Sequence, residues 1–319
     1  TSFTYTNDAL TLSTTNKVSN ITAVMADVTL GAKKSETVYT GNEGEEKALK
    51  TYNYNFDGDQ IKTITSFTYT NDALTLSTTN KVSNITAVMA DVTLGAKKSE
   101  TVYTGNEGEE KALKTYNYNF DGDQIKTITS FTYTNDALTL STTNKVSNIT
   151  AVMADVTLGA KKSETVYTGN EGEEKALKTY NYNFDGDQIK TVTSFFYTND
   201  ALTSSNTNKV SNITAVMADV VLGAMKSITT YTGNEGEEKA QVTYNYNFDG
   251  NQIKTITSFT YTNDALTLST TNKVSNITAV MADVTLGAKK SETVYTGNEG
   301  EEKALKTYNY NFDGDQIKT

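Results

Sequence analysis

The side chains able to do chemistry in this chain are carboxylates, lysine amines, hydroxyls and amides. Histidine, cysteine and arginine are all absent from the sequence. Without imidazole or thiol, the commonest general base, the usual nucleophile–base pairs and the nitrogen–sulfur ligand sets for zinc or iron cannot be built. The composition therefore argues against an enzyme, and we expect neither catalytic residues nor a bound cofactor.

One pair of carboxylates has a spacing that fits a metal ligand. Asp57 and Asp59 flank Gly58, and Ca²⁺ binds about six to eight oxygen ligands, carboxylates among them. Asp-Gly is also the chemistry of a tight turn, and Asn251 stands at the position of Asp59 in a later copy of the segment. The turn is the favoured interpretation, with a calcium site as the alternative.

A second candidate site is the N-glycosylation sequon Asn-Ile-Thr. In a secreted protein this sequon marks a surface loop. It occurs five times, at Asn20, Asn84, Asn148, Asn212 and Asn276. These asparagines are the candidate modification sites.

The whole chain is a tandem array of one 64-residue segment. The copies are 1–64, 65–128, 129–192, 193–256 and 257–319, the last lacking one residue. Self-similarity at a fixed period is typical of solenoids and arrays. A chain with no unique stretch has no place for a one-of-a-kind active site, and we expect the five repeats to form one continuous structural unit.

Each repeat has the pattern of β-strands and turns. Residues 51–56 place Tyr52, Tyr54 and Phe56 on one face, as a half-buried strand requires. Asp57-Gly58 predicts a reversal and residues 60–70 a returning strand, followed by a turn at Asn71-Asp72. Residues 85–94 form the most continuously apolar run and predict a strand buried on both sides, or a strand pair near the core.

Two architectures fit this all-β pattern. One is a continuous, elongated, solenoid-like array of antiparallel β-strips, and the other is a string of small β-sandwich domains. Residues 62–69 span a repeat boundary as an unbroken strand pattern, and neither proline nor a Gly/Ser-rich spacer interrupts any boundary. The sequence therefore favours the continuous array.

The fourth copy differs from the first at ten positions. Glu36→Ile228 and Val38→Thr230 lie two residues apart, so they indicate an apolar contact moved along one strand face. Leu49→Gln241 beside Lys50→Val242 moves the apolar side chain from one strand face to the other. This indicates a shallow position or a local slip of register.

The strip from Thr51 to Thr65 (TYNYNFDGDQIKTIT) resembles the YD repeats of bacterial RHS-type surface and toxin-shell proteins. In that family a Tyr-x-Tyr-Asp-like strand meets a glycine-containing turn and a returning strand. The resemblance covers about one strip in four, and Asn55 stands where the family has its Asp. It implies a long spiralling antiparallel sheet, and in family members such shells enclose a toxin domain.

Charge and hydropathy narrow the functional class. The formal net charge of −10 and pI near 4.7 argue against nucleic acid as a partner. No apolar run approaches the roughly 18 residues of a membrane span. We expect an extracellular structural protein of a bacterial cell surface, forming a filament, sheath or stalk, with a rigid adhesin spacer and an RHS-like shell as alternatives. Expected partners are further copies, joined end to end or laterally, and cell-surface glycans that stack on the tyrosines.

Overall fold

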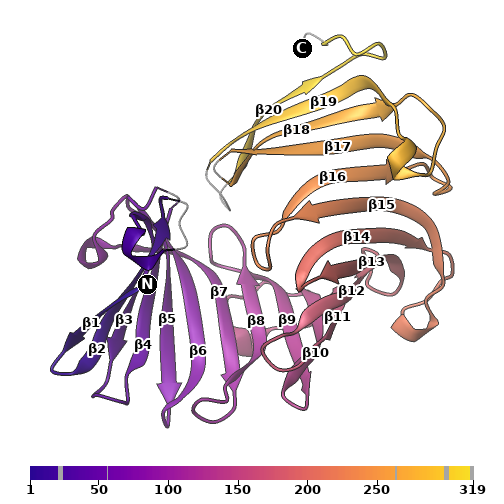
Figure 1. The fold of residues 1–319 in the computed structure, drawn as a ribbon. Helices are drawn as coiled ribbons and strands as arrows, with labels where there is room; N and C mark the ends of the chain where they lie inside the picture. Colours follow the sequence, from indigo (N-terminus) through magenta and orange to yellow (C-terminus); the bar gives the residue numbers. More distant parts are fainter. Residues whose placement is uncertain (21–23, 56, 263, 298–301, 317–319) are drawn as a thin grey trace. The chain divides into compact units, whose positions relative to one another are not determined.

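The described part of the chain is an all-β structure of antiparallel strands, as the sequence predicts, with short 3₁₀ turns between some of them. The computed structural model describes residues 1–20, 24–55, 57–262, 264–297 and 302–316. Its twenty strands belong to one open sheet (Figure 1). Contacts divide the chain into two compact units, Thr1–Phe131 with Thr143–Gly159, and Thr132–Thr142 with Ala160–Thr319.

The elements recur in the same order in every repeat, four strands and one short 3₁₀ turn (η) for each 64 residues. Among the described residues no helix has the length and apolarity needed to cross a bilayer. The elements of the first two repeats are β1 (Ser2–Thr6), β2 (Ala9–Val18), η1 (Met25–Asp27), β3 (Leu30–Thr40), β4 (Lys47–Tyr54), β5 (Ile61–Thr70), β6 (Ala73–Val82), η2 (Met89–Asp91), β7 (Leu94–Thr104) and β8 (Lys111–Tyr118). Those that follow are β9 (Ile125–Thr134), β10 (Ala137–Val146), η3 (Met153–Asp155), β11 (Leu158–Thr168), β12 (Lys175–Tyr182), β13 (Ile189–Thr198), β14 (Ala201–Val210), η4 (Met217–Asp219), β15 (Leu222–Thr232), β16 (Lys239–Tyr246), β17 (Ile253–Thr262), β18 (Ala265–Val274), η5 (Met281–Asp283), β19 (Leu286–Thr296) and β20 (Lys303–Asn309).

Strands run through the repeat boundaries without interruption. In the first unit β5 contains the boundary between residues 64 and 65, and it pairs with β4 on one side and β6 on the other. Ile64 lies opposite Tyr52, and Thr65 lies opposite Thr51. In the second unit β13 and β17 cross their boundaries in the same register.

The turns follow the chemistry of their residues. Asn71 and Asp72 both have positive φ, 49° and 67°, as a two-residue type I′ hairpin turn requires. Gly58 also has a positive φ, and a Cβ atom there would lie 2.4 Å from the backbone nitrogen of Lys33. The Asp57-Gly58 turn therefore packs on the start of β3, where only glycine fits.

The hydrophobic core lies at the junctions between repeats. In the first unit Tyr52, Tyr54, Ile61 and Ile64 form a buried cluster, and Ile61 and Ile64 are only 2–3 % exposed. The side chains that cover this cluster come from the second repeat as well as the first: Val38, Val82, Met89 and Val92. Clusters around Ile125 in the first unit and Ile189 in the second are built in the same way. One repeat thus completes the core of the repeat before it.

Two details of the sequence prediction are wrong. Residues 85–93 are a surface loop with a 3₁₀ turn rather than a buried strand, Leu94 is the first residue of β7, and Ile85 is 83 % exposed. Residues Met89 and Val92 of that loop do reach the core. Phe56 lies outside the described residues, but its counterpart Phe120 follows the end of β8 and is 83 % exposed, so the alternation ends at the second tyrosine.

The register of the fourth repeat is unchanged by its substitutions. Thr230 lies opposite Val242, as Val38 lies opposite Lys50. Leu49 has no residue opposite it in the pairing of β3 with β4, and Gln241 has none in the pairing of β15 with β16. A β-bulge falls at this position in both repeats. The predicted slip is therefore a bulge that the repeats share, which explains why glutamine is accepted at position 241.

Candidate functional site

A recurring group of charged side chains lies where two repeats meet, at the end of the strands that carries the Asn-Asp turns. In the first unit Lys47, at the start of β4, places its Nζ 2.7 Å from Oδ1 of Asp72 and 3.2 Å from Oε1 of Glu107. Both acids belong to the second repeat. The Lys47 amine also lies 5.7 Å from the ring centre of Tyr69, whose hydroxyl donates to the carbonyl of Ala48 at 3.0 Å. We call this group the junction clamp.

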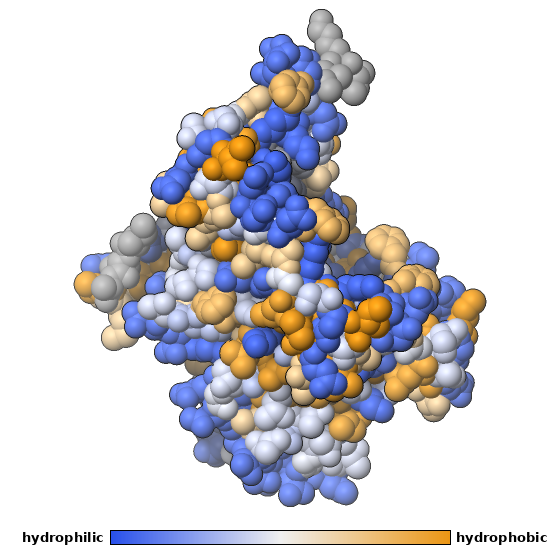
Figure 2. All heavy atoms as spheres, turned by 90° about the vertical axis from the view of Figure 1, so that its right-hand side faces the viewer, coloured by the Kyte–Doolittle hydropathy of each residue, from blue (hydrophilic) through white to orange (hydrophobic). Residues whose placement is uncertain are grey.

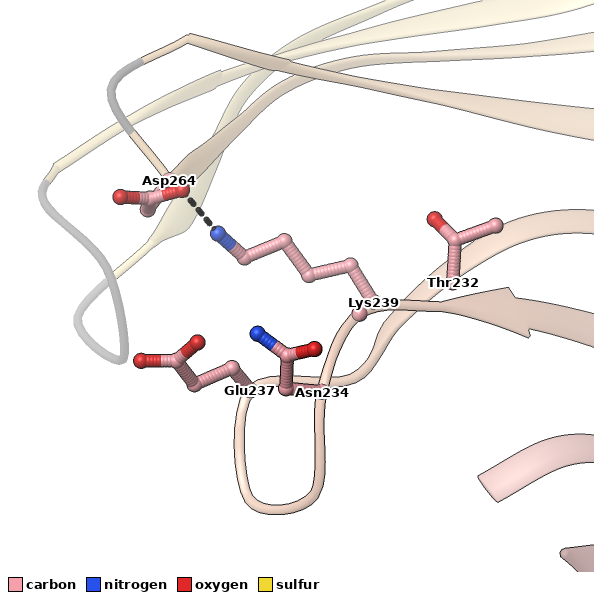
Figure 3. Close-up of a pocket in the computed structure, with 6 residues that line it drawn as sticks. Thr232, Asn234, Glu237, Lys239 and Asp264 are labelled. Atoms are coloured by element: carbon pink, nitrogen blue, oxygen red, sulfur yellow. Dashed lines mark hydrogen bonds and ion pairs between the residues drawn. The ribbon is translucent and has the colours of Figure 1, made fainter. Parts of the chain in front are cut away.

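The second unit contains the clamp again. Lys175 lies 2.5 Å from Asp200 and 3.4 Å from Glu235, and Lys239 pairs with Asp264 (Figure 3). The pockets beside Lys47, Lys175 and Lys239 have volumes of about 390, 660 and 540 Å³, respectively. Threonine, glycine, asparagine and charged side chains line all three. They are open, and the first two are also lined by the rings of Tyr69 and Tyr197, so charged groups and one aromatic face meet in a site that does not enclose a ligand as small-molecule pockets do.

The protonation of the clamp suits an ion pair rather than a nucleophile. The hydrogen bond to Asp200, followed by the charges of Asp200 and Glu235, raises the pKa of Lys175 despite its partial desolvation. An amine used for covalent chemistry needs a lowered pKa. Lysine, aspartate and glutamate therefore meet here as a charge network that joins two repeats.

The glutamate that ends the neighbouring turn fixes its backbone. Glu110 accepts a hydrogen bond from the Leu74 backbone nitrogen at 2.8 Å and another from Gly108 at 3.0 Å. The Leu74 bond is the main reason that the pKa of Glu110 is lowered. Glu238 receives the same bonds from Leu202 and Gly236 in the second unit. These carboxylates stabilise the turn as charged acceptors.

A second polar group lies on the core face. Lys33 Nζ is 2.8 Å from Glu36 Oε1, and the hydroxyl of Tyr54 donates to the other carboxylate oxygen. Glu36 is only 7 % exposed. Burial, followed by the hydrogen bond and charge of Glu36, raises the pKa of Tyr54 far above its usual range. A side chain that acts as a general base must lose its own proton near neutral pH. Tyr54 keeps its proton at that pH and serves as a hydrogen-bond donor.

The fourth repeat replaces this buried group as a unit. Met225 and Ile228 stand where Lys33 and Glu36 stand in the first repeat, and Tyr246 remains. Asn206 lies directly opposite Ile228, at the position of Thr14 opposite Glu36. A charged pair has been exchanged for an apolar pair. The sequence shows that positions 225 and 228 change together, but only the structure shows that these two positions are in contact.

The tyrosine hydroxyl also fastens one repeat to the next. Tyr54 lies 3.1 Å from the carbonyl oxygen of Ala87, in the loop of the following repeat. Tyr246 keeps this bond, at 3.2 Å to Ala279, although its glutamate has been lost. Close by, the backbone nitrogen of Ile61 donates to Thr86 at 2.7 Å. We call the tyrosine bond the tyrosine latch.

The candidate calcium ligands form a turn in the structure. Asp57 and Asp59 are both exposed. Asn55 donates to Oδ1 of Asp59 at 2.7 Å and accepts from its backbone nitrogen at 3.1 Å. Asn251 makes the same pair with Asn247 in the fourth repeat. Within the described ranges no group of three or more acidic side chains is placed to hold a metal ion.

The sequon asparagines all hold the loop that begins with them. Asn84 Nδ2 donates to the carbonyl of Asp91 at 2.8 Å, and its Oδ1 accepts from the backbone nitrogen of Thr93 at 2.8 Å. The same bonds occur at Asn20, Asn148, Asn212 and Asn276. The nitrogen that would carry a glycan is therefore already bonded within the loop.

Comparison with known proteins gives little further information. No protein-family model matches the chain, and no curated protein matches its sequence. A solved structure titled "Crystal Structure of TcdB2-TccC3-TEV" is similar to it at a TM-score of 0.23 and 12 % identity, over 90 % of this chain and 16 % of that one. The chain thus spans about a sixth of that protein's length. A TM-score this low does not define a shared fold, so no property is transferred.

Proposed function

We propose that this chain is a non-enzymatic structural protein, a tandem β-repeat segment of an extracellular filament, sheath or stalk at a bacterial surface. The observation that carries the proposal is the shared core. Met89 and Val92 of one repeat cover Ile61 and Ile64 of the repeat before it. Because the following repeat completes each of the three buried clusters, an added copy extends the packed structure.

The polar contacts support the same role. The junction clamp and the tyrosine latch each join a residue of one repeat to the next, and both recur in the two units. The titratable groups in these contacts hold the protonation states of an ion pair and a hydrogen-bond donor. Such a chain would supply length and stiffness, and the same features suit a rigid spacer within a larger adhesin.

Electron micrographs of the purified protein test this proposal. The expected image is a uniform particle whose length grows by a constant increment when one whole 64-residue repeat is added. A matched control is a chain of the same length in which the repeats are joined by Gly/Ser linkers. Particles that look like separate beads with bends at the repeat boundaries would overturn the proposal.

A further inference from the structure

The two ends of the strands carry different chemistry. The loops after β6 and β8, residues 83–93 and 119–124, leave from one end of the strands, and the turns 71–72 and 105–110 leave from the other. We call the first, with its counterparts, the apolar edge and the second the acidic edge. Each repeat contains four strands, and successive strands run in opposite directions. Since four is an even number, equivalent loops of successive repeats leave from the same edge.

The apolar edge exposes one isoleucine and one phenylalanine in each of the second to fifth repeats. Ile85 and Phe120 are both 83 % exposed. Their counterparts, all 81–83 % exposed, are Ile149 in the first unit and Phe184, Ile213, Phe248, Ile277 and Phe312 in the second. Figure 2 shows hydrophobic side chains at the surface among hydrophilic ones. Single exposed apolar residues are ordinary, but the recurrence of the same two residues at one edge offers a partner repeated points of contact.

The phenylalanine rings are held in place. Lys81 lies 3.5 Å from the ring centre of Phe120 and donates to its carbonyl at 2.8 Å. Lys209 lies 3.4 Å from the ring of Phe248 and donates to its carbonyl at 2.8 Å. A fixed anchor loses less conformational entropy when it binds than a free side chain does.

The apolar side chains form a series along the edge. The nitrogen of Ile125, just after the Phe120 turn, donates to Thr150 at 2.7 Å, and Thr150 is the neighbour of Ile149. The Phe120 turn therefore lies beside the next isoleucine loop. Four strands at about 4.8 Å each give a spacing of about 19 Å between equivalent side chains. A partner that contacts equivalent side chains of two successive repeats must present its own contact points at this spacing.

A second copy of this chain carries the same spacing, and local charge does not oppose the pairing. The apolar edge of the second repeat carries the acids Asp91, Asp121 and Asp123, and the lysines that balance them are Lys81, Lys98 and Lys126. Two such edges can therefore meet without net repulsion, although the whole chain has a charge of −10. The acidic edge contains Asp72 and three glutamates in 105–110, so two acidic edges would repel.

We propose that the apolar edge is a lateral interface with the apolar edge of a second copy of this chain. Within the second unit the isoleucines and phenylalanines recur from repeat to repeat, so several weak contacts add up along its edge. The proposal deepens the proposed function by naming the surface through which structural arrays associate.

Sedimentation velocity of the 319-residue protein between about 1 and 100 µM tests the interface, because a series of weak contacts needs concentrations of this order. We expect association that strengthens with concentration. A variant with Ile149→Ser, Ile213→Ser, Phe248→Ser and Ile277→Ser should weaken it at least about tenfold, with an unchanged circular dichroism spectrum because these side chains are exposed. The matched control is Leu113→Gln with Leu177→Gln, a change that the fourth repeat carries naturally at Gln241.

Disulfide trapping gives an independent answer, because the chain has no cysteine of its own. Ile213→Cys should form dimers rapidly under mild oxidation, and Asn234→Cys at the acidic edge should not. A wild-type protein that stays monomeric at 100 µM, equal trapping at both sites, or binding to phosphatidylcholine vesicles in place of self-association would overturn the interface. A monomer would leave the proposed function standing, whereas beads in micrographs would remove that function and leave the interface standing.

Discussion

The amine of Lys97 lies 2.8 Å from a carboxylate oxygen of Glu100, which is only 7 % exposed, and the fourth repeat has Met225 and Ile228 at these two positions. The same pair of positions is therefore occupied by a charged pair in one repeat and by an apolar pair in another. Removing one partner of a buried pair costs more than exchanging both for apolar groups.

The first prediction is a coupling energy for this pair. Lys97→Met should lower the free energy of unfolding by about 1–3 kcal/mol, because it leaves the Glu100 carboxylate buried without its cation. The double variant Lys97→Met with Glu100→Ile should recover most of that loss. Urea unfolding followed by circular dichroism measures all three proteins. Additive losses in the double variant would show that the two positions act independently.

The second prediction separates the two roles of the tyrosine. Tyr246→Phe removes only the bond to Ala279 and should cost about 1 kcal/mol. Tyr118→Phe also removes the donor to Glu100, so it should cost about 2–3 kcal/mol, since a hydrogen bond to a charged group is worth more. Equal losses for the two variants, measured by urea unfolding, would contradict this description of the latch.

The third prediction concerns alkaline pH. Burial and the contact with Glu100 raise the pKa of Tyr118 in the folded protein. The folded state therefore holds this proton more tightly than the unfolded state, in which the pKa is about 10. The resulting stability is complete below pH 10 and is lost as the pH rises beyond it.

The thermal midpoint should therefore fall between pH 10 and pH 12, and Tyr118→Phe with Tyr182→Phe should make that fall smaller. Tyr5→Phe is the control, because Tyr5 is 60 % exposed, and it should leave the profile unchanged. The same pH dependence in all three proteins would rule out the buried tyrosines as its cause.

The fourth prediction concerns the junction clamp. Lys175→Met should lower stability slightly at low salt, and the difference from wild type should shrink in about 1 M NaCl, where the screening length falls to about 3 Å. Lys190→Met is the control, because Lys190 is exposed and its amine donates to the uncharged side chain of Gln188. A loss that persists at high salt would show that the lysine stem, not its charge, supports the junction.

Period and turn chemistry were enough to predict the all-β fold, the antiparallel strips and the unbroken junction strands. The burial of Tyr52 and Tyr54 also follows from alternation alone. The loop at 85–93 was mispredicted because hydrophobicity does not reveal that the Asn84 side chain bonds both sides of the loop. The clamp and the latch join residues 25–60 positions apart, and no local pattern records such contacts.

The account depends on strands that pass through repeat boundaries, and hydrogen exchange at the third boundary tests it most directly. The peptide 189–198 can be followed by mass because Val192 and Phe196 occur in no other junction. We predict that its amides exchange as slowly as those of β15 within the fourth repeat. Exchange as fast as that of the surface loop 211–221 would contradict a continuous array.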